Sequence, residues 1–494
     1  MSATQLSELD NVLKQSQQAF DIYKKISPVQ RALFLESIAD EIEKLRAELV
    51  EAAHAETHLP LPRLNGEIGR TTAQLKLFAR LIKEGSWVEA AIDTADNNRV
   101  PAKPDTRKLL VPVGPVVVFG ASNFPFAFST AGGDTASVLA SGSTVIIKGH
   151  PAHPNTSLLA FAAIQKAIQL AGLPLHTVQH IASADNSMGE ALVKHPLTTG
   201  VAFTGSFKGG TALLDYARQR PNPIPVFAEM GSVNPVVFLP DTLRNNAATL
   251  AQTYAASITL GMGQFCTNPG LLLAIESEDT DTFLQLLGEE ISKIVPQKML
   301  HTGIQQAYNK GLSGALAYNG VELLGKSFQA LNELDAAPTV AKVNGANFLA
   351  NPHLQEEVFG PYSLAVVCAD KEELLLALQQ LNGQLTSTLM ATDADLAEHA
   401  DILELQASIA GRVILNTVPT GVEVCASMVH GGPYPATTDA RFTSVGTTAI
   451  KRWVRPVCLQ GFTDALLPEA LQNSNPLHIW RIVNNVWTKD AVEG

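Results

Sequence analysis

Three polar side chains in this sequence, a thiol, a carboxylate and an amide, each lie where a predicted strand or helix passes into a loop. Cys266 is at the centre of GMGQFCTNPG, Glu229 ends an apolar run in EMGSVNP, and Asn123 follows another in FGASNFPF. A thiol in a polar, backbone-rich turn can ionise near neutral pH, and the thiolate is the nucleophile. The three groups would supply the nucleophile, base and oxyanion donor of an acyl-enzyme mechanism. Alternatively, Cys266 is a small buried packing residue, as isolated cysteines usually are.

These residues are positioned by an alternation of strands and helices that covers most of the chain. Residues 5–86 have apolar side chains at helical spacing, and Ser27-Pro28 is a typical helix start. From residue 113 onward, short apolar runs such as STVIIK, TVQHIA and GVAFTGS alternate with helical segments of about 10 to 15 residues. This order predicts an α/β fold built from parallel βαβ units. A further helix is expected at residues 129–139, soon after Asn123.

The length of the chain predicts more than one domain. We expect a first α/β domain at residues 1–93 and 113–231, and a second at residues 232–448. The proline-containing stretch 94–112 and the Trp- and Pro-rich end 449–494 are expected to form an extended arm and a C-terminal segment, because neither makes an independent core.

Composition narrows the class of protein. The 494-residue chain is 46% hydrophobic and 17% charged, with a formal net charge of −12 and no Lys/Arg block, which argues against nucleic acid or an anionic membrane as a partner. Four cysteines without a CxxC pair, and an N-terminus without an apolar signal core, indicate a cytoplasmic protein. No uninterrupted apolar run reaches the roughly 20 residues of a membrane-spanning helix. An anionic substrate would need a local basic pocket.

Candidate nucleotide-binding residues follow two of the predicted strands. FTGSFKGGTALL places Gly205 and Ser206 after a strand and Gly210 at a helix start, where backbone amides and the helix dipole favour phosphate. This is not the GxGxxG fingerprint, and a plain strand-to-helix turn is the alternative. Lys148 ends the strand STVIIK and could reach a ribose or phosphate, or be a solvated lysine.

Three other patterns are weaker. GVELLGKS, at residues 320–327, formally matches a P-loop, but its interior is typical of a short strand. Glu357, in HLQEEVFGP, precedes a strand, where its carboxylate could hold a sugar hydroxyl or cap the loop. The histidine pairs 150/153 and 176/180 have ligand spacing, but no Cys or Asp completes either set, so we expect no metal site.

Six motifs, SNFPF, VIIK, FTGS, EMGS, GQFCTNPG and EEVFGP, together resemble the NAD(P)-dependent aldehyde dehydrogenase superfamily in their order and spacing. The likeness covers nearly the whole chain. The stretches GASNFPFAFSTAGGDTASVLASG and VHGGPYPATTDARFTSVGTTAIKRW are similar to the 2,5-dioxovalerate (α-ketoglutarate semialdehyde) dehydrogenase branch. The resemblance implies two Rossmann-type α/β domains, one binding the cofactor and one catalytic, a small β oligomerisation arm, and a homodimer or homotetramer.

The resemblance also implies a role for each site residue. Cys266 would be the nucleophile, Asn123 and the Cys266 backbone N–H the oxyanion hole, and Glu229 the base that activates water for deacylation. The expected cofactor-binding residues are Lys148, His150, Gly205, Ser206, Gly210, Glu357 and Phe359. Independently of the resemblance, we expect the rings of Phe124, Phe128 and Phe265 to wall the substrate tunnel, with packing in the core as the alternative. From its position in the TTDARFTSVG loop, Arg441 is expected to be the cation at the tunnel mouth, with a plain surface arginine as the alternative.

Departures from the family pattern bear on cofactor and substrate. The usual KPxE is here Lys148-Gly149-His150-Pro151, and without the acid a 2′-phosphate is tolerated, so NADP⁺ is favoured and NAD⁺ stays open. The expected reaction is the oxidation of 2,5-dioxopentanoate to 2-oxoglutarate. The alternatives are oxidation of long-chain fatty or other neutral aldehydes, and a non-catalytic dinucleotide-binding structural protein. The joint presence of Cys266 and Glu229 speaks against the last.

Overall fold

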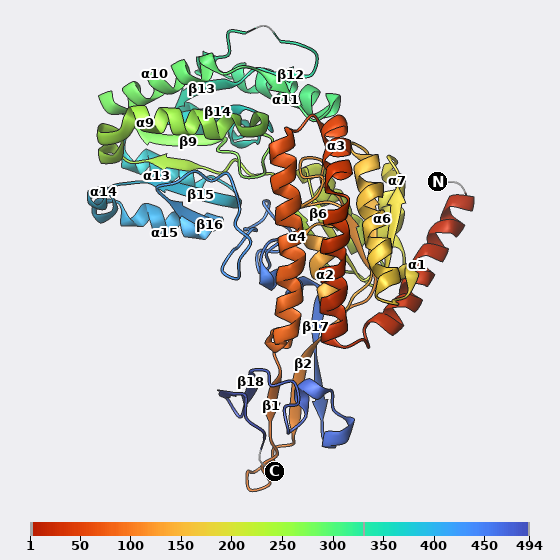
Figure 1. Cartoon of the computed structure of the whole chain (residues 1–494). Helices are drawn as coiled ribbons and strands as arrows, with labels where there is room; N and C mark the ends of the chain where they lie inside the picture. Colours follow the sequence, from red (N-terminus) through yellow and green to blue (C-terminus); the bar gives the residue numbers. More distant parts are fainter. Residues whose placement is uncertain (1–2, 330, 493–494) are drawn as a thin grey trace.

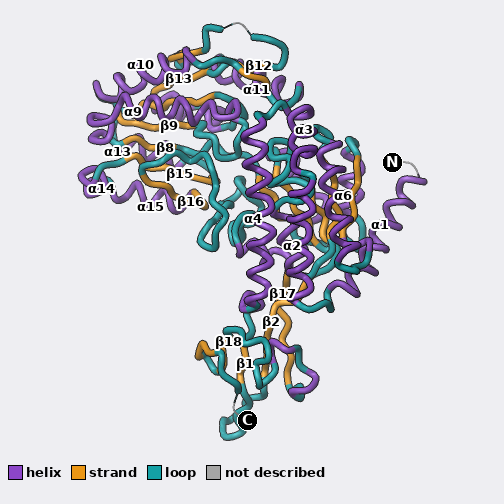
Figure 2. Tube along the Cα trace, in the orientation of Figure 1, coloured by secondary structure: helices purple, strands orange, loops and turns teal. Residues whose placement is uncertain are grey.

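The computed structural model describes residues 3–329 and 331–492, which form two α/β lobes and a projecting arm (Figure 1). The first lobe contains a five-stranded sheet, the second a seven-stranded sheet, and the arm another five-stranded sheet. Figure 2 shows helices on the outside of each lobe and an arm made mainly of strands and loops, with two short 3-10 turns. Among the described residues, no helix combines the length and apolar character needed to cross a bilayer.

The first-lobe sheet has the order β5-β4-β3-β6-β7, and all four pairings are parallel. Its strands are β3 (Val116–Phe119), β4 (Val145–Gly149), β5 (Val178–Ala182), β6 (Gly200–Thr204) and β7 (Val226–Glu229). One hydrophobic core joins one face to α2 (Pro28–Lys44), α3 (Arg46–Thr57), α4 (Leu61–Glu84), α5 (Gly133–Ser141) and α6 (Pro154–Leu170). A second core joins the other face to α1 (Ala3–Tyr23), α7 (Asn186–Lys194) and α8 (Phe207–Arg218). This is a doubly wound sheet.

The second-lobe sheet has the order β11-β13-β14-β9-β8-β15-β16, and only the edge strand β11 runs antiparallel to its neighbour. Its strands are β8 (Val236–Phe238), β9 (Leu271–Ile275), β11 (Glu322–Lys326), β13 (Thr339–Asn344), β14 (Tyr362–Cys368), β15 (Gln384–Met390) and β16 (Ala410–Leu415). α9 (Pro240–Thr259) and α10 (Glu278–Lys293) cover one face. The other carries α11 (Thr302–Leu316), α12 (Gly345–Ala350), α13 (Lys371–Gln379) and α15 (Ala400–Ile409), with α14 (Asp393–Glu398) before α15. A two-stranded pair joins β10 (Gln297–Lys298) to β12 (Asp335–Ala336).

The arm joins two distant parts of the chain. Its sheet has the order β17-β2-β1-β18-β19, with β1 (Ala91–Asp93), β2 (Thr106–Pro112), β17 (Val454–Gln460), β18 (Arg481–Val483) and β19 (Val486–Thr488). β17 pairs with β2 along its whole length, from Val454 opposite Pro112 to Gln460 opposite Thr106. β1 lies in this sheet too, although residues up to 93 were expected in the first domain.

Local expectations are met at two elements and fail at one. Ser27 caps α2 in a capping box with Gln30, and residues 322–326 form a strand, so the formal P-loop match does not wrap a phosphate. The helix expected from residue 129 begins only at Gly133. The chain turns first, because the Gly132 N–H bonds to the Ser129 carbonyl at 2.9 Å.

Candidate active site

Polar side chains gather where parallel strands of the first lobe end. Asn123 follows β3, Lys148 lies near the end of β4, Ser206 follows β6, and Glu229 is the last residue of β7. Because these strands run parallel, the loops after their carboxyl ends meet at one edge of the sheet, where α/β proteins bind ligands. Cys266 reaches this edge from the second lobe.

A tight turn before Cys266 determines where its thiol lies. In the turn Leu260–Gly263 that follows α9, three residues have positive φ, between 54° and 61°. A side chain at Gly263 would collide with the Gly360 carbonyl oxygen, so only glycine fits. Nδ2 of Asn234 then donates to the Cys266 carbonyl oxygen at 2.9 Å, which ties the loop to the segment after β7.

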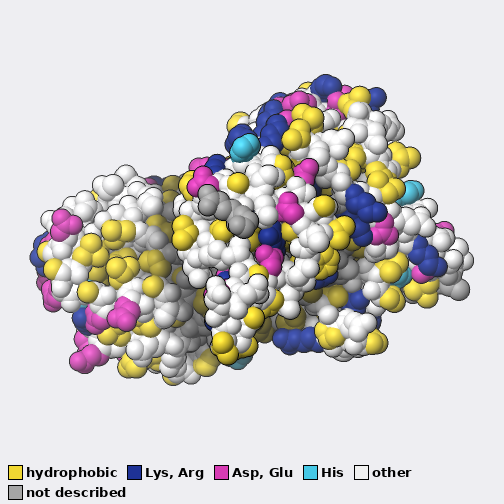
Figure 3. Space-filling view, turned by 90° about the horizontal axis from the view of Figure 1, so that it is seen from below, with side chains coloured by type: hydrophobic (Ala, Val, Ile, Leu, Met, Phe, Trp, Pro, Cys, Tyr) yellow, Lys and Arg dark blue, Asp and Glu magenta, His cyan; other side chains and the backbone are white. Residues whose placement is uncertain are grey.

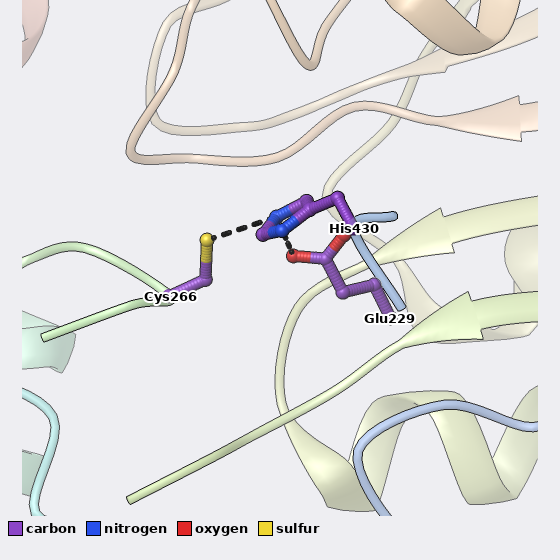
Figure 4. Close-up of side chains that lie close together, drawn as sticks. All are labelled: Glu229, Cys266 and His430. Atoms are coloured by element: carbon purple, nitrogen blue, oxygen red, sulfur yellow. Dashed lines mark hydrogen bonds and ion pairs between the residues drawn. The ribbon is translucent and has the colours of Figure 1, made fainter. Parts of the chain in front are cut away.

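Cys266, His430 and Glu229 point toward one another (Figure 4). Sγ of Cys266 lies 3.4 Å from Nε2 of His430, and the same nitrogen lies 3.0 Å from Oε1 of Glu229. The His430 and Glu229 side chains are 1% and 3% exposed, whereas Cys266 is partly exposed. Ser444 donates to the other Glu229 oxygen at 2.7 Å. When a thiol, an imidazole and a carboxylate lie side by side in this order, the imidazole can take the proton of the thiol. The carboxylate then orients the imidazole and stabilises its positive charge.

The pKa values of the thiol and the carboxylate are shifted in opposite directions. Burial and the nearby charge of Glu229 raise the pKa of the Cys266 thiol well above its ordinary value, and Arg70 opposes that shift. Burial also raises the pKa of Glu229, but the charge of His430 and close contacts with His430, Ser444 and Cys266 outweigh it and leave this pKa below its ordinary value. The polar turn therefore does not make the thiol acidic by itself, and deprotonation needs a base.

Asn123 lies beside the loop that carries the thiol. Its Nδ2 donates to the carbonyl oxygen of Gln264, two residues before Cys266, at 3.2 Å. A side-chain amide has two N–H donors, so one remains for a substrate oxygen. The backbone carbonyl oxygen of Asn123 accepts a hydrogen bond from Nη2 of Arg63 at 2.8 Å.

Phe124, Phe128 and Phe265 form an aromatic cluster next to these groups. The ring centroids of Phe124 and Phe128 are 5.3 Å apart and those of Phe124 and Phe265 5.5 Å, both edge-to-face. The Phe128 ring lies 6.1 Å from that of His430. The Arg63 guanidinium lies over Phe124 and Phe265, at 5.0 and 4.6 Å.

Arg70, on α4, is an arginine whose charge acts on the thiol. Its guanidinium carbon lies 5.4 Å from the Phe128 ring centroid, and its charge lowers the pKa of Cys266. Within residues 3–329 and 331–492 it has no hydrogen bond or ion pair, and its Nε is buried without a partner. Arg441 is instead 80% exposed, with its guanidinium 2.6 Å from the Asp439 carboxylate. The structure does not bring the Arg441 side chain into the group around Cys266.

The sequence matches the model of the aldehyde dehydrogenase family over residues 1–434. The chain belongs to the aldehyde dehydrogenase family. Alpha-ketoglutaric semialdehyde dehydrogenase 2 of Azospirillum brasilense is 47% identical over 479 residues, which is 96% of this chain and 91% of the relative. Alpha-ketoglutaric semialdehyde dehydrogenase of Acinetobacter baylyi is 46% identical over 493 residues, 99% of this chain and 93% of the relative. The resemblance stated from the six motifs is confirmed.

Solved structures confirm the fold. Gamma-glutamyl-gamma-aminobutyraldehyde dehydrogenase from Burkholderia cenocepacia superposes with a TM-score of 0.77 at 21% identity, over 92% of this chain and 88% of that one. Glyceraldehyde-3-phosphate dehydrogenase from Methanocaldococcus jannaschii, complexed with NADP, gives 0.78 at 19% identity, over 92% and 94%. The expected aldehyde dehydrogenase-like α/β architecture is therefore present.

Aldehyde dehydrogenases use NAD(P), and the dehydrogenase has a free cation where the cofactor was expected. Lys148 makes no hydrogen bond or ion pair within the described part of the chain, and partial burial lowers its pKa. Burial, reinforced by His153, Lys148 and His301, lowers the pKa of His150 to about 3. His150, expected to bind the cofactor, is therefore neutral at pH 7 and offers it hydrogen bonds but no positive charge.

The FTGS segment of the dehydrogenase combines a helix cap with close packing. Ser206 caps α8 by accepting from the Gly209 N–H at 3.2 Å. A Cβ at Gly205 would lie 2.6 Å from the Phe203 ring, and one at Gly210 would lie 2.5 Å from the Met230 sulfur. Packing thus explains both glycines, while the start of α8 still presents N–H groups to an anion.

Glu357 and Phe359 line one pocket of the dehydrogenase, between the Cys266 loop and β14. Glu357 is exposed and Phe359 partly exposed. Burial of its carboxyl group raises the pKa of Glu357 to about 8, although the residue as a whole is exposed, so near neutral pH this group can donate a hydrogen bond to a sugar hydroxyl as well as accept one. Lys148 offers a cation, and the start of α8 offers N–H groups, to the phosphates of a dinucleotide.

Sequence reasoning missed three residues of this site in the dehydrogenase. His430 stands in the quoted stretch VHGGPYP but was assigned no role. Arg63 and Arg70 lie in the stretch of residues 5–86, for which only helical spacing was noted; α4 in fact begins at Leu61 and carries both. Two signals could have indicated these residues. His430 stands in a glycine-rich loop, and the two arginines stand on a helix that otherwise packs against the core.

Proposed function

We propose that this aldehyde dehydrogenase oxidises 2,5-dioxopentanoate, α-ketoglutarate semialdehyde, to 2-oxoglutarate with NAD(P)⁺. The two relatives at 46–47% identity carry the name of that activity. The observation that carries the proposal is Arg70, an unpaired guanidinium whose charge reaches Cys266 in a chain of net charge −12. The distal carboxylate of this substrate gives Arg70 the partner that the described residues of the chain do not provide.

The first step in this proposal is general-base activation of the thiol. The proton of Cys266 moves to Nε2 of His430, and the ionised Glu229 stabilises the imidazolium. The thiolate adds to the aldehyde carbon, forming a C–S bond and an oxyanion. Nδ2 of Asn123 and the Cys266 N–H donate to that oxyanion, and one such donor is typically worth about 3–4 kcal/mol of barrier.

A bound NAD(P)⁺ would supply the hydride acceptor, and loss of hydride from the adduct carbon would leave a thioester on Cys266. Glu229 is ionised at neutral pH, because its neighbours lower its pKa by more than burial raises it. Its carboxylate can therefore take a proton from the attacking water. The C–S bond then breaks, the sulfur regains a proton and the carboxylate leaves. A positioned base of this kind contributes about 10²–10⁴-fold in rate.

For the cofactor, we propose a preference for NADP⁺. Pro151 stands where the family acid would repel a 2′-phosphate, and Lys148, three residues earlier on β4, is an ammonium group without a partner among the described residues. The neutral His150 adds hydrogen-bonding capacity only. Comparison of kcat/KM for the two cofactors tests this. An advantage of more than about tenfold for NAD⁺, or about 1.4 kcal/mol, contradicts it.

We further propose a cytoplasmic homodimer or homotetramer whose partners are its small-molecule substrate and cofactor, without nucleic acid or membrane. All four cysteines are free thiols, as a reducing compartment maintains them. The arm, with its exposed edge strand β19, supports assembly with further copies.

The substrate proposal is tested with the Arg70→Met variant, which keeps an extended apolar side chain. We expect its KM for 2,5-dioxopentanoate to rise about 10- to 100-fold, as loss of a charge-assisted contact predicts, with butanal changed less than about twofold. Arg441→Ala is the matched control and separates this proposal from the arginine chosen on sequence grounds. A KM increase confined to Arg441→Ala, or wild-type preference for long-chain neutral aldehydes, contradicts the proposal.

A further inference from the structure

One oxygen of the catalytic carboxylate has no proton donor. Oε1 of Glu229 is buried and receives a hydrogen bond from no described group, although Nε2 of His430 lies only 3.0 Å away. The two atoms are within ion-pair distance, but no hydrogen bond joins them. A buried carboxylate oxygen without a donor is costly, and a cation at this point would satisfy it.

The atoms around this oxygen form a metal-ligand set. Sγ of Cys266, Nε2 of His430 and a Glu229 carboxylate oxygen all lie within 4.8 Å of one another. Zinc bonds of about 2.3 Å to sulfur and about 2.0 Å to nitrogen or oxygen, at tetrahedral angles, put ligand atoms about 3.3–3.5 Å apart. Two of the observed separations, 3.4 Å from sulfur to nitrogen and 3.0 Å from nitrogen to oxygen, are close to these values, and the third, from sulfur to oxygen, lies within 4.8 Å.

We propose that Cys266, His430 and Glu229 form a reversible binding site for Zn²⁺ or a similar thiophilic divalent ion, and that occupancy blocks the nucleophile. The ion replaces the thiol proton, which leaves to solvent, and bonds to the thiolate, the neutral imidazole and the carboxylate. Thiolate and imidazole select zinc over Mg²⁺ and Ca²⁺. Three protein ligands leave one position open for water or a substrate oxygen.

The surroundings of the ligands indicate an exchangeable ion. Ser444 fixes the Glu229 carboxylate, but Nδ1 of His430 has no hydrogen-bond partner in the described structure. Permanent sites usually give that nitrogen a carboxylate or carbonyl partner, and its loss typically costs 10- to 100-fold in affinity. The nearby charge of Arg70 also opposes a cation. This site does not depend on which aldehyde the enzyme oxidises.

The test measures binding directly. Metal-free enzyme is titrated with Zn²⁺ against a chromophoric chelator, and we expect one tight equivalent in the wild type. Cys266→Ser and His430→Phe should each weaken zinc binding by about 100-fold or more. Loss of a residue that only hydrogen-bonds to a metal ligand typically weakens binding less, by about 10- to 100-fold. Co²⁺ in place of zinc should give a thiolate-to-metal charge-transfer band that disappears in Cys266→Ser.

Cys425→Ser is the matched control, since it removes another partly exposed thiol, and it should keep both the tight equivalent and the cobalt band. One equivalent of Zn²⁺ should stop wild-type turnover, and a chelator should restore it. Thermal unfolding of each variant checks that it is folded. Unchanged zinc affinity in folded Cys266→Ser or His430→Phe, or equal affinity of the wild type for Mg²⁺, overturns the proposal.

Discussion

The position of Nε2 of His430 decides how the thiol is activated. This nitrogen faces both the sulfur of Cys266, at 3.4 Å, and the carboxylate of Glu229, at 3.0 Å. The thiol itself is a poor acid, because burial and the carboxylate raise its pKa. We therefore expect proton transfer during attack rather than a thiolate that exists before the substrate binds.

The His430→Phe variant tests that base. Phenylalanine keeps a ring in the cluster with Phe128 but cannot accept a proton. We expect kcat/KM to fall by about 100-fold, the lower end of the usual range for general-base catalysis, and iodoacetamide alkylation of Cys266 at pH 7 to slow. His353→Phe, at a side chain 67% exposed, is the control and should match the wild type. Unchanged alkylation in His430→Phe would show that another group takes the proton.

The pH dependence of alkylation tests the direction of the thiol shift. Since the pKa of Cys266 is raised well above 9.0, the thiolate fraction should still be increasing at that pH. We expect the iodoacetamide rate at Cys266, followed by mass spectrometry of its peptide, to climb through pH 9 without a plateau. Cys266→Ser provides the blank. A plateau below pH 8 would indicate a stable thiolate–imidazolium pair and contradict the general-base description.

The sequence predicted chemistry at the ends of strands but not contacts across the chain. Glu229 and Asn123 could be placed because each follows a short apolar run, and parallel strands bring their ends together. His430 is 164 residues from Cys266, in a loop with no periodicity, so no local pattern could join them. Arg441 was chosen for its segment alone, and side-chain direction in a loop cannot be read from sequence.

At the scale of elements, helix α4 both packs and supplies cations. Its buried face joins the core of the first lobe, as its apolar spacing predicted. From the same helix Glu67 accepts the N–H groups of Phe126 and Ala127, at 2.8 and 2.9 Å, and so fixes the loop after Asn123. Arg70, one turn further on, lies beside Phe128. Periodicity reports the packed face of a helix but not what its other side chains reach.

Two helical glycines, Gly210 in α8 and Gly314 in α11, should respond to alanine in opposite ways. At Gly210 a Cβ would lie 2.5 Å from the Met230 sulfur and 3.2 Å from the Ala228 Cβ, both in the segment that carries Glu229. We expect Gly210→Ala to lower the free energy of unfolding by about 1–3 kcal/mol through overpacking. At Gly314 no atom lies within 4 Å of the added carbon, so Gly314→Ala should raise the free energy of unfolding by about 0.5–1 kcal/mol. Urea unfolding midpoints measure both, and a stabilised Gly210→Ala would show that Met230 yields freely.

At the scale of the whole molecule, the active site takes residues from both lobes, while the arm extends away from it (Figure 1). The pairing of β17 with β2 could not be predicted in register, because more than 300 residues separate the strands and neither forms a core alone. The arm also exposes large apolar side chains, Leu466 at 72%, Val486 at 63% and Trp487 at 60%. Figure 3, seen from below, shows hydrophobic side chains exposed among charged ones.

Assembly through the arm should depend on Trp487. It lies on β19, the last strand of the arm sheet, which among the described residues pairs with β18 alone, so that its other edge can pair with another chain. A buried tryptophan at an interface is typically worth about 2 kcal/mol or more, so Trp487→Glu should weaken association by about 30-fold. Sedimentation velocity over a concentration series should then show a shift from oligomer to monomer. Leu170→Glu, at an equally exposed leucine at the end of α6, is the control and should sediment as the wild type does. If both variants keep the wild-type mass, or if the wild type is itself a monomer, the arm does not mediate assembly through this edge.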